Sequence, residues 1–146
     1  MLSVLAGLFD PLGTISPIVV PMKVLFQELC VKNVDWDEEL INQNAKRYME
    51  WVNDLKEEKS ITLDRCVYDD TGEEVLSCEL HGFGDASEKA YCAVVYFVYR
   101  TPTRIHVRLL TAKTRIAPLK PLTIPRLQLM SAILLARLMI SLKNDL

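Results

Sequence analysis

The chain has 146 residues, of which half are hydrophobic and 25% are charged, and its formal net charge is −2. This length fits one ordinary domain or two small ones, and the charge argues against a grip on nucleic acid by overall electrostatics. The 4 cysteines lack C-x-x-C spacing and only 2 histidines are present, which argues against a zinc site or a disulfide framework and predicts the reduced thiols of an intracellular, cytoplasmic protein.

The N-terminal part of the chain is predicted to be helical. It lacks a basic stretch before its apolar residues, so we expect no secretory signal. Ser16 and Pro17 suit the cap and the first position of a helix. Pro21 lies inside this helix, and it either moves the start to residue 20 or 21 or kinks the first turn. Apolar residues at helical spacing form the expected buried face: Val19, Met22, Phe26 and Leu29.

A second helix is predicted from Glu38 to Glu58, with Asp37 as its cap. We interpret Trp36 and Trp51 as core packing between the helices rather than as a platform on which bases stack. The apolar side chains of this helix fall on one face: Ile41, Ala45, Tyr48, Val52 and Leu55.

A charged run at residues 56–60 marks the expected boundary between a helical connection segment, 1–60, and a second domain, 61–146. After a short extended segment, Asp70-Thr71-Gly72 spells a motif of retroviral-type aspartic proteases. Residues 69–74 contain 4 carboxylates, which would repel one another if they were buried as in a protease. We therefore interpret the motif as a hydrophilic turn in which Gly72 takes a positive φ. An aspartic peptidase that uses Asp70 stays open as an alternative.

Two neighbouring strands are predicted next, from Val75 to Phe83 and from Tyr91 to Arg100. The second strand carries aromatic, β-branched and small apolar side chains, which is typical of a strand that is buried on both faces. In the first strand, Gly82 and Gly84 would let another backbone or a ligand come close.

The residue that follows these glycines is a carboxylate, Asp85. A carboxylate next to a buried strand must be solvated, paired or bound to a metal. The simpler interpretation is that Asp85 begins the turn and caps Ala86 and Ser87 through its side chain. Ser87 lies in no Gly-x-Ser-x-Gly elbow, which argues against a role as a nucleophile.

A third strand is predicted from Arg104 to Ala112, and His106 shares a face of this strand with Arg108, so we expect a solvated histidine. The residues from Lys113 to Lys120 are predicted to form a basic loop. The stretch from Arg100 to Lys120 holds no acidic residue, so it could meet phosphates, although a solvated strand face is the commoner meaning of such a run.

The last predicted element is a helix from Pro125 to Lys143 that lies across the sheet. Arg126, Gln128 and Arg137 interrupt its apolar sequence, so we expect no membrane span. The fold class is therefore α+β, with a helical segment followed by a three-stranded antiparallel meander and one helix. Six side chains form the expected buried stripe of the last helix: Leu127, Met130, Ile133, Leu134, Leu135 and Leu138.

Three motifs together carry a resemblance to a known family. They are GLFDPLGTISPIVVPMKVLFQELC at Gly7–Cys30, ELHGFGDASEKAYCAVVY at Glu79–Tyr96 and LLTAKTRIAPLKPLTIPRLQLMSAILLARL at Leu109–Leu138. In this order, and over nearly the whole chain, the sequence resembles Bel/Pao-type retrotransposon polyproteins at the junction of reverse transcriptase and a ribonuclease H-like domain. This region is commonly filed as Pao retrotransposon peptidase. The resemblance implies that residues 61–146 are the first half of a ribonuclease H-like domain.

The resemblance also implies a metal-dependent nuclease site. Ribonuclease H-like nucleases use Mg²⁺ ions held by a cluster of carboxylates, and the resemblance places the first of these at Asp85. It places the second in the first turn of the last helix, where the family pattern is Pro-Arg-Leu-Glu-Leu but this chain has Gln128 in place of the glutamate. The remaining ligands are expected on later elements, beyond Leu146. We therefore expect no Mg²⁺ to be held by this chain alone, and no nuclease activity.

The implied partners are an RNA/DNA hybrid and the remainder of the polyprotein, and no membrane. Lys113, Arg115 and Lys120 are the candidate contacts to the nucleic-acid backbone. An open sheet edge would allow self-association. A non-catalytic module that binds a partner through this edge or through the basic loop stays open as a further alternative.

Overall fold

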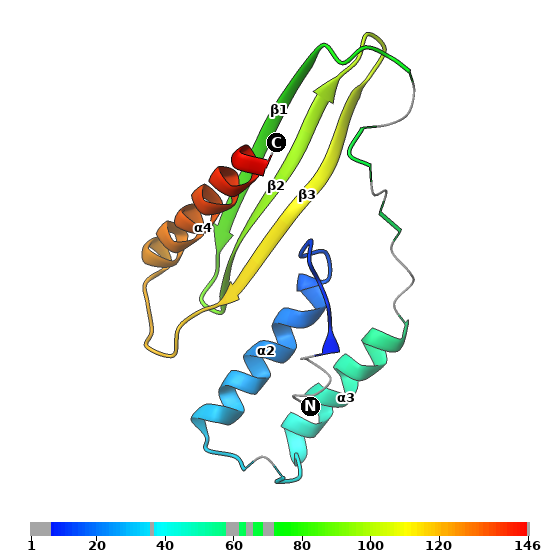
Figure 1. Cartoon of the computed structure of the whole chain (residues 1–146). Coiled ribbons are helices and arrows are strands. Elements are labelled where there is room, and N and C mark those ends of the chain that lie inside the picture. Colours follow the sequence, from blue (N-terminus) through cyan, green and yellow to red (C-terminus); the bar gives the residue numbers. More distant parts are fainter. Residues whose placement is uncertain (1–6, 36, 58–61, 64–65, 69–71, 146) are drawn as a thin grey trace. The chain divides into compact units, whose positions relative to one another are not determined.

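The computed structural model describes residues 7–35, 37–57, 62–63, 66–68 and 72–145 (Figure 1). They form two compact units, one with two helices and one with a three-stranded sheet, a helix and residues 11–14. The α+β fold is the one predicted, while the assignment of residues 1–60 and 61–146 as domains stays a prediction. The elements are α2 (Ser16–Val31), α3 (Asn42–Glu57), β1 (Ser77–Ala86), β2 (Ala90–Arg100), β3 (Ile105–Ile116) and α4 (Ile124–Asp145).

Helix α2 starts where the sequence predicts and continues through its internal proline. Ile15 holds the N-cap position, and Pro17 lies in the first turn, where the missing N–H of proline costs nothing. Pro21 is exposed inside the helix. The alternative start at residue 20 or 21 is therefore wrong, and so is the assignment of Ser16 as the cap residue.

Helix α3 begins at Asn42, four residues later than predicted. Asn42 has a φ of 52°, and this left-handed conformation, which asparagine tolerates, keeps the preceding residues out of the helix. Asp37 therefore does not cap α3. Ile41 lies outside the helix and is 63% exposed, so it does not belong to the buried face as predicted.

The core of this unit forms where α2 packs against α3. Trp51 is buried against Met22, Leu25 and Leu29, and its indole N–H donates a hydrogen bond of 2.7 Å to the carbonyl of Ile18. Tyr48, Val52 and Leu55 pack against the same cluster. The prediction of core packing for Trp51 is confirmed, whereas Trp36 lies outside the described residues.

The second unit is built on an antiparallel meander with strand order β1-β2-β3 (Figure 1). Strand β2 lies in the centre, and only alternate side chains are buried: Tyr91, Ala93, Val95, Phe97 and Tyr99. The side chains between them are half-buried, so the predicted burial on both faces is wrong. The reason is that α4 contacts β1 and β2 and covers a single face of the sheet.

Strand β3 extends to Ile116, four residues beyond the predicted end, and the predicted basic loop is wrong for residues 113–116. A bulge interrupts its pairing with β2, because Val95 pairs with Thr111 while Tyr96 pairs with Leu109. On the outer edge of β3, the N–H of Ala112 donates a hydrogen bond of 2.6 Å to the carbonyl of Leu12.

Helix α4 lies on the sheet through the face that the sequence predicts. Leu127 and Leu134 are buried against Tyr91 and Ala93, and Met130, Leu135 and Leu138 pack around them. Ile133 is 46% exposed and does not belong to this stripe, contrary to the prediction. The buried positions 127, 131 and 134 are about one helical turn apart, so they lie on one side of the helix, and the opposite side is exposed.

Candidate functional site

The candidate site lies at one end of the sheet, where the turn between β1 and β2, the end of β3 and the start of α4 come together (Figure 1). Asp85 is the last residue but one of β1 and pairs with Cys92 of β2. Its side chain is exposed, and one carboxylate oxygen accepts a hydrogen bond of 2.8 Å from the N–H of Ala86. The predicted capping by Asp85 is therefore present at Ala86.

The turn that follows is held by Ser87. Its hydroxyl oxygen accepts hydrogen bonds from the N–H groups of Lys89 at 3.3 Å and of Ala90 at 3.2 Å. The N–H of Ser87 donates to the carbonyl of Ala90 at 2.8 Å, so the predicted cap of Ser87 by Asp85 is not the one formed. The Ser87 hydroxyl, rather than the Asp85 carboxylate, therefore closes the turn.

Helix α4 runs antiparallel to β1, and this direction decides where Gln128 lies. Leu135 lies over Gly82, and Ser131 lies over Gly84, one turn closer to the start of the helix. Gln128 precedes Ser131 by a further turn and is exposed. It therefore lies at the same end of the sheet as Asp85, while the alternation of side chains along β1 puts Asp85 on the face opposite to α4.

The donor atoms at this end do not form a two-metal Mg²⁺ site. Asp85 supplies one carboxylate, and Gln128 supplies a neutral amide oxygen from the other face of the sheet, whereas two Mg²⁺ ions need several charged oxygen ligands. Within residues 7–35, 37–57, 62–63, 66–68 and 72–145, no three His, Cys, Asp or Glu residues lie close enough together to hold a metal.

Exposed basic residues gather at the same end. Lys113 and Arg115 pair with Ala93 and Tyr91 of β2, and directly paired residues share a face of the sheet. Both therefore lie on the side that α4 packs against, beyond the two strands that α4 contacts. Both fall in the predicted loop, although the small residues Ala112 and Thr114 continue to alternate with Thr111, Lys113 and Arg115, which was a signal for the strand.

Lys120, in the connection to α4, is exposed as well, and so is Arg126 in the first turn of the helix. Sequence analysis did not propose Arg126 as a contact residue. Together with Lys113 and Arg115, these residues form what we call the basic end of the sheet. The turn between β1 and β2 brings two acidic side chains, Asp85 and Glu88, to the same end. The four basic residues outnumber them, so the local charge is positive although the whole chain is slightly acidic.

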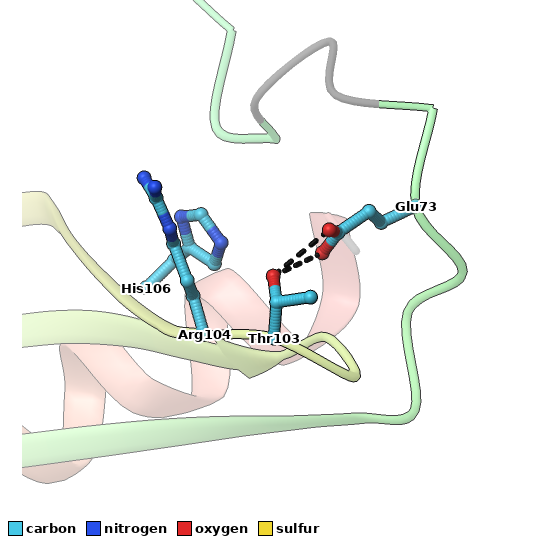
Figure 2. Close-up of a pocket in the computed structure, with 4 residues that line it drawn as sticks. All are labelled: Glu73, Thr103, Arg104 and His106. Atoms are coloured by element: carbon cyan, nitrogen blue, oxygen red, sulfur yellow. Dashed lines mark hydrogen bonds between the residues drawn. The ribbon is translucent and has the colours of Figure 1, made fainter.

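A pocket of about 360 Å³ lies at the other end of the sheet, and Figure 2 shows the four side chains that line it. Glu73, before β1, accepts a hydrogen bond from the hydroxyl group of Thr103 in the turn between β2 and β3, while the side chain of Arg104 extends beside His106 (Figure 2). Hydrogen bonds from the hydroxyl groups of Thr101 and Thr103 lower the pKa of Glu73, and the positive charge of Arg104 adds to the effect. The fourth side chain, His106, stacks on Tyr99 with ring centroids 4.4 Å apart, so the expectation of a simply solvated histidine is wrong.

The pocket is far from Asp85, because the turn between β2 and β3 and the turn between β1 and β2 lie at opposite ends of β2. The 11 residues of β2 correspond to roughly 35 Å at about 3.3 Å per residue. The sequence does not predict this pocket. Glu73 lies in the predicted acidic turn, and nothing in the sequence links this residue to Thr103.

The protease-like motif is described only in part. Gly72 has a φ of 69°, as expected for a glycine in a turn. Asp70 and Thr71 lie outside the described residues, so the peptidase alternative stays an untested prediction.

By length and composition, Ile124–Asn144 could also cross a membrane. The polar residues that were expected to exclude a span therefore do not exclude one by composition alone. Core helices of soluble proteins pass the same criterion, and α4 packs its Leu127, Ser131 and Leu134 side chains against the sheet.

Comparison with known proteins gives one match. The family model of the Pao retrotransposon-like RNaseH-like domain matches residues 1–146. Comparisons with the curated proteins and with the solved structures give no match. The matched region contains the meander, the helix on the sheet and Asp85 at the end of β1. The chain thus belongs to the family of Pao retrotransposon-like ribonuclease H-like domains.

Proposed function

We propose that this domain binds an RNA/DNA hybrid at the basic end of its sheet and, by itself, does not cleave it. The observation that carries the proposal is the exposure of Lys113 and Arg115 on the same face of β3, at the end of the sheet where Asp85 lies. Residues two apart on a strand are separated by about 6.6 Å, so each side chain can reach a different phosphate. Lys120 and Arg126 extend the same surface.

A positive surface of this kind binds through the phosphate backbone. Each phosphate contact releases counterions from the nucleic acid, so the affinity falls as salt rises. The slightly negative charge of the whole chain does not oppose this, because exposed charges further apart than about 8 Å are largely screened at physiological salt.

The absence of cleavage is proposed from the donor atoms. At this end Asp85 offers a single carboxylate and Gln128 offers only a neutral amide on the other face, whereas two-metal phosphoryl transfer needs ions that neutralise the attacking and leaving oxygens. A site that holds such ions weakly should bind the hybrid without hydrolysing it. The family to which the chain belongs supports the choice of a nucleic-acid partner.

The test is a titration of a labelled RNA/DNA hybrid at several salt concentrations. The Lys113→Gln/Arg115→Gln variant should weaken binding and reduce the slope of log affinity against log salt by about two. A matched control, Lys23→Gln/Lys32→Gln, removes two exposed lysines, one in α2 and one at its C-cap, and should leave both quantities unchanged. Binding that does not respond to salt, or equal losses in the two variants, contradicts the proposal.

Cleavage is tested on the same hybrid with Mg²⁺ present. The unaltered chain and its Asp85→Asn variant should both leave the hybrid intact. Cleavage by the unaltered chain that disappears in Asp85→Asn would show that Gln128 does not prevent catalysis.

We further propose self-association through β1, because this strand pairs only with β2 among the described residues and so leaves one edge for another strand. Sedimentation at increasing protein concentration tests this, and a monomer throughout contradicts it. An intracellular location is proposed from the family and from the free, exposed thiols of Cys30, Cys66 and Cys78.

A further inference from the structure

Ser131 is a polar residue in the middle of the apolar contact between α4 and the sheet. It is 1% exposed, and its hydroxyl donates a hydrogen bond of 2.6 Å to the carbonyl of Cys92 in β2. A buried hydroxyl without a partner is costly, so this bond is required wherever Ser131 is buried. The bond joins the helix to a backbone carbonyl of the central strand. The position of this carbonyl is fixed by the strand and does not depend on the rotamer of a neighbouring side chain.

Strand β1 is shaped to receive this hydroxyl. A Cβ atom on Gly84 would lie 2.5 Å from the Ser131 oxygen, and a Cβ atom on Gly82 would lie 2.7 Å from a terminal carbon of Leu135. Because both positions are glycine, α4 can approach β1 closely enough for Ser131 to reach across it to β2. The two glycines and the serine therefore form one fitted contact.

This contact fixes how far α4 lies along the sheet. Apolar contacts such as those of Leu127 and Leu134 are not directional, so a small slide of the helix would cost them little. A hydrogen bond weakens steeply as its distance and angle depart from the optimum. The bond from Ser131 thus selects one position of the helix among several that its apolar stripe would permit.

The position of the helix matters because its first turn lies at the basic end of the sheet. Gln128 and Arg126 precede Ser131 by about 4.5 and 7.5 Å along the helix axis, at about 1.5 Å per residue. A slide of α4 would move both residues relative to Asp85, Lys113 and Arg115, which belong to the strands.

We propose that Ser131 is a positioning residue, whose hydrogen bond to Cys92 places Arg126 and Gln128 at the basic end of the sheet, on the face that Lys113 and Arg115 share. This inference rests on the proposed binding of an RNA/DNA hybrid at that end. Ser131 does not touch the hybrid and acts only through the residues of the first helical turn.

The test is a double-mutant cycle on hybrid affinity. Arg126→Gln should weaken binding severalfold in the unaltered chain and by less than twofold in the Ser131→Ala variant, where Arg126 is no longer held in place. Lys113→Gln, on the strand, should weaken binding equally in both backgrounds. A loss of overall stability alone would change both effects alike.

Leu138→Ala is the matched control, because it weakens the packing of the same helix without touching Ser131. In this background Arg126→Gln should keep its full effect. Gly84→Ala, which pushes against Ser131 from the strand, should reproduce the result of Ser131→Ala and serves as the second variant if either protein is too unstable to assay.

A second measurement does not depend on binding. Methyl NOEs between Ala86 and the Leu127 cluster report the position of the first helical turn, and they should change in Ser131→Ala but not in Leu138→Ala. If the unaltered chain shows no salt-dependent affinity for the hybrid, the proposed function fails, and unchanged NOEs in Ser131→Ala overturn the positioning role independently. If the chain binds and Arg126→Gln has the same effect in all backgrounds, only the positioning role is overturned.

Discussion

The hydroxyl oxygen of Thr103 lies 2.8 and 2.9 Å from the two carboxylate oxygens of Glu73. Beside this contact, the N–H of Leu76 donates a hydrogen bond of 2.8 Å to the carbonyl of Arg100. Together they hold the segment that precedes β1 against the end of β2 and the following turn. The segment is thus attached to the sheet before β1 begins.

The Glu73 contact should depend on pH. Hydrogen bonds from Thr101 and Thr103 lower the pKa of Glu73 below its ordinary value of 4.5. A group with a lowered pKa in the folded state stabilises the fold above the unfolded value and loses this contribution as pH falls through the folded value. The melting temperature of the unaltered chain should therefore exceed that of Glu73→Gln at neutral pH, and the difference should vanish in acid. A difference in melting temperature that persists at a pH below the folded and the unfolded pKa of Glu73 would contradict this.

Trp51 should stabilise the helical unit through its hydrogen bond as well as its size. Trp51→Phe keeps an aromatic ring but leaves the carbonyl of Ile18 without the indole N–H, which should cost about 1–3 kcal/mol. Urea unfolding followed by far-UV circular dichroism measures the change. Met49→Ala, at an exposed position of the same helix, is the control and should change stability by less than about 0.5 kcal/mol.

The two glycines of β1 should differ in their tolerance of a methyl group. At Gly82 the added Cβ would meet the end of the flexible Leu135 side chain, whereas at Gly84 it would meet the buried Ser131 hydroxyl. Gly84→Ala should therefore lower the melting temperature more than Gly82→Ala, with a cost of about 1–3 kcal/mol for overpacking at residue 84. Thermal unfolding of the two variants side by side decides this, and an equal or reversed order would show that Leu135 is the less adaptable neighbour.

Truncation of two leucines on α4 should have very different effects on stability. Leu127 is 1% exposed and Leu129 is 62% exposed. Leu127→Ala should destabilise the sheet unit by about 2–5 kcal/mol, because it leaves a cavity against Tyr91 and Ala93. Leu129→Ala should stay within about 0.5 kcal/mol. Denaturant titration measures both, and a large loss in Leu129→Ala would indicate that this residue is covered in solution.

The parts of the fold that the sequence predicts are those with strong local patterns. The run from Tyr91 to Tyr99 is rich in aromatic and β-branched residues, and the leucines of α4 repeat at helical spacing, so both elements are found with small errors at their ends. The spacing of Ile41 fits the predicted helix, but hydrophobic periodicity does not report the left-handed backbone conformation of Asn42, which keeps Ile41 out of it.

The candidate site is predicted less completely, for a different reason. Asp85 follows from the motif, but the surface around it depends on contacts between distant parts of the chain. Ser131 and Cys92 are separated by 39 residues, and Glu73 and Thr103 by 30. Lys113 and Arg115 fall in a predicted loop because a run of charged residues is typical of loops, and the alternation around them is short. The one sequence signal that could have indicated a buried role for Ser131 is its position as a single serine within the apolar stripe of α4.

The single extra residue in β3 has a consequence for the charge of the sheet. Before the bulge at Leu110, even-numbered residues such as Arg108 pair with buried residues of β2, and after it odd-numbered residues such as Lys113 and Arg115 do so. Because a shift of one residue turns side chains to the other face, the inserted residue gathers all three cations on one side. If the same residues paired with β2 without the bulge, Lys113 and Arg115 would lie on the face opposite to Arg108, and the positive charge would be divided between two faces.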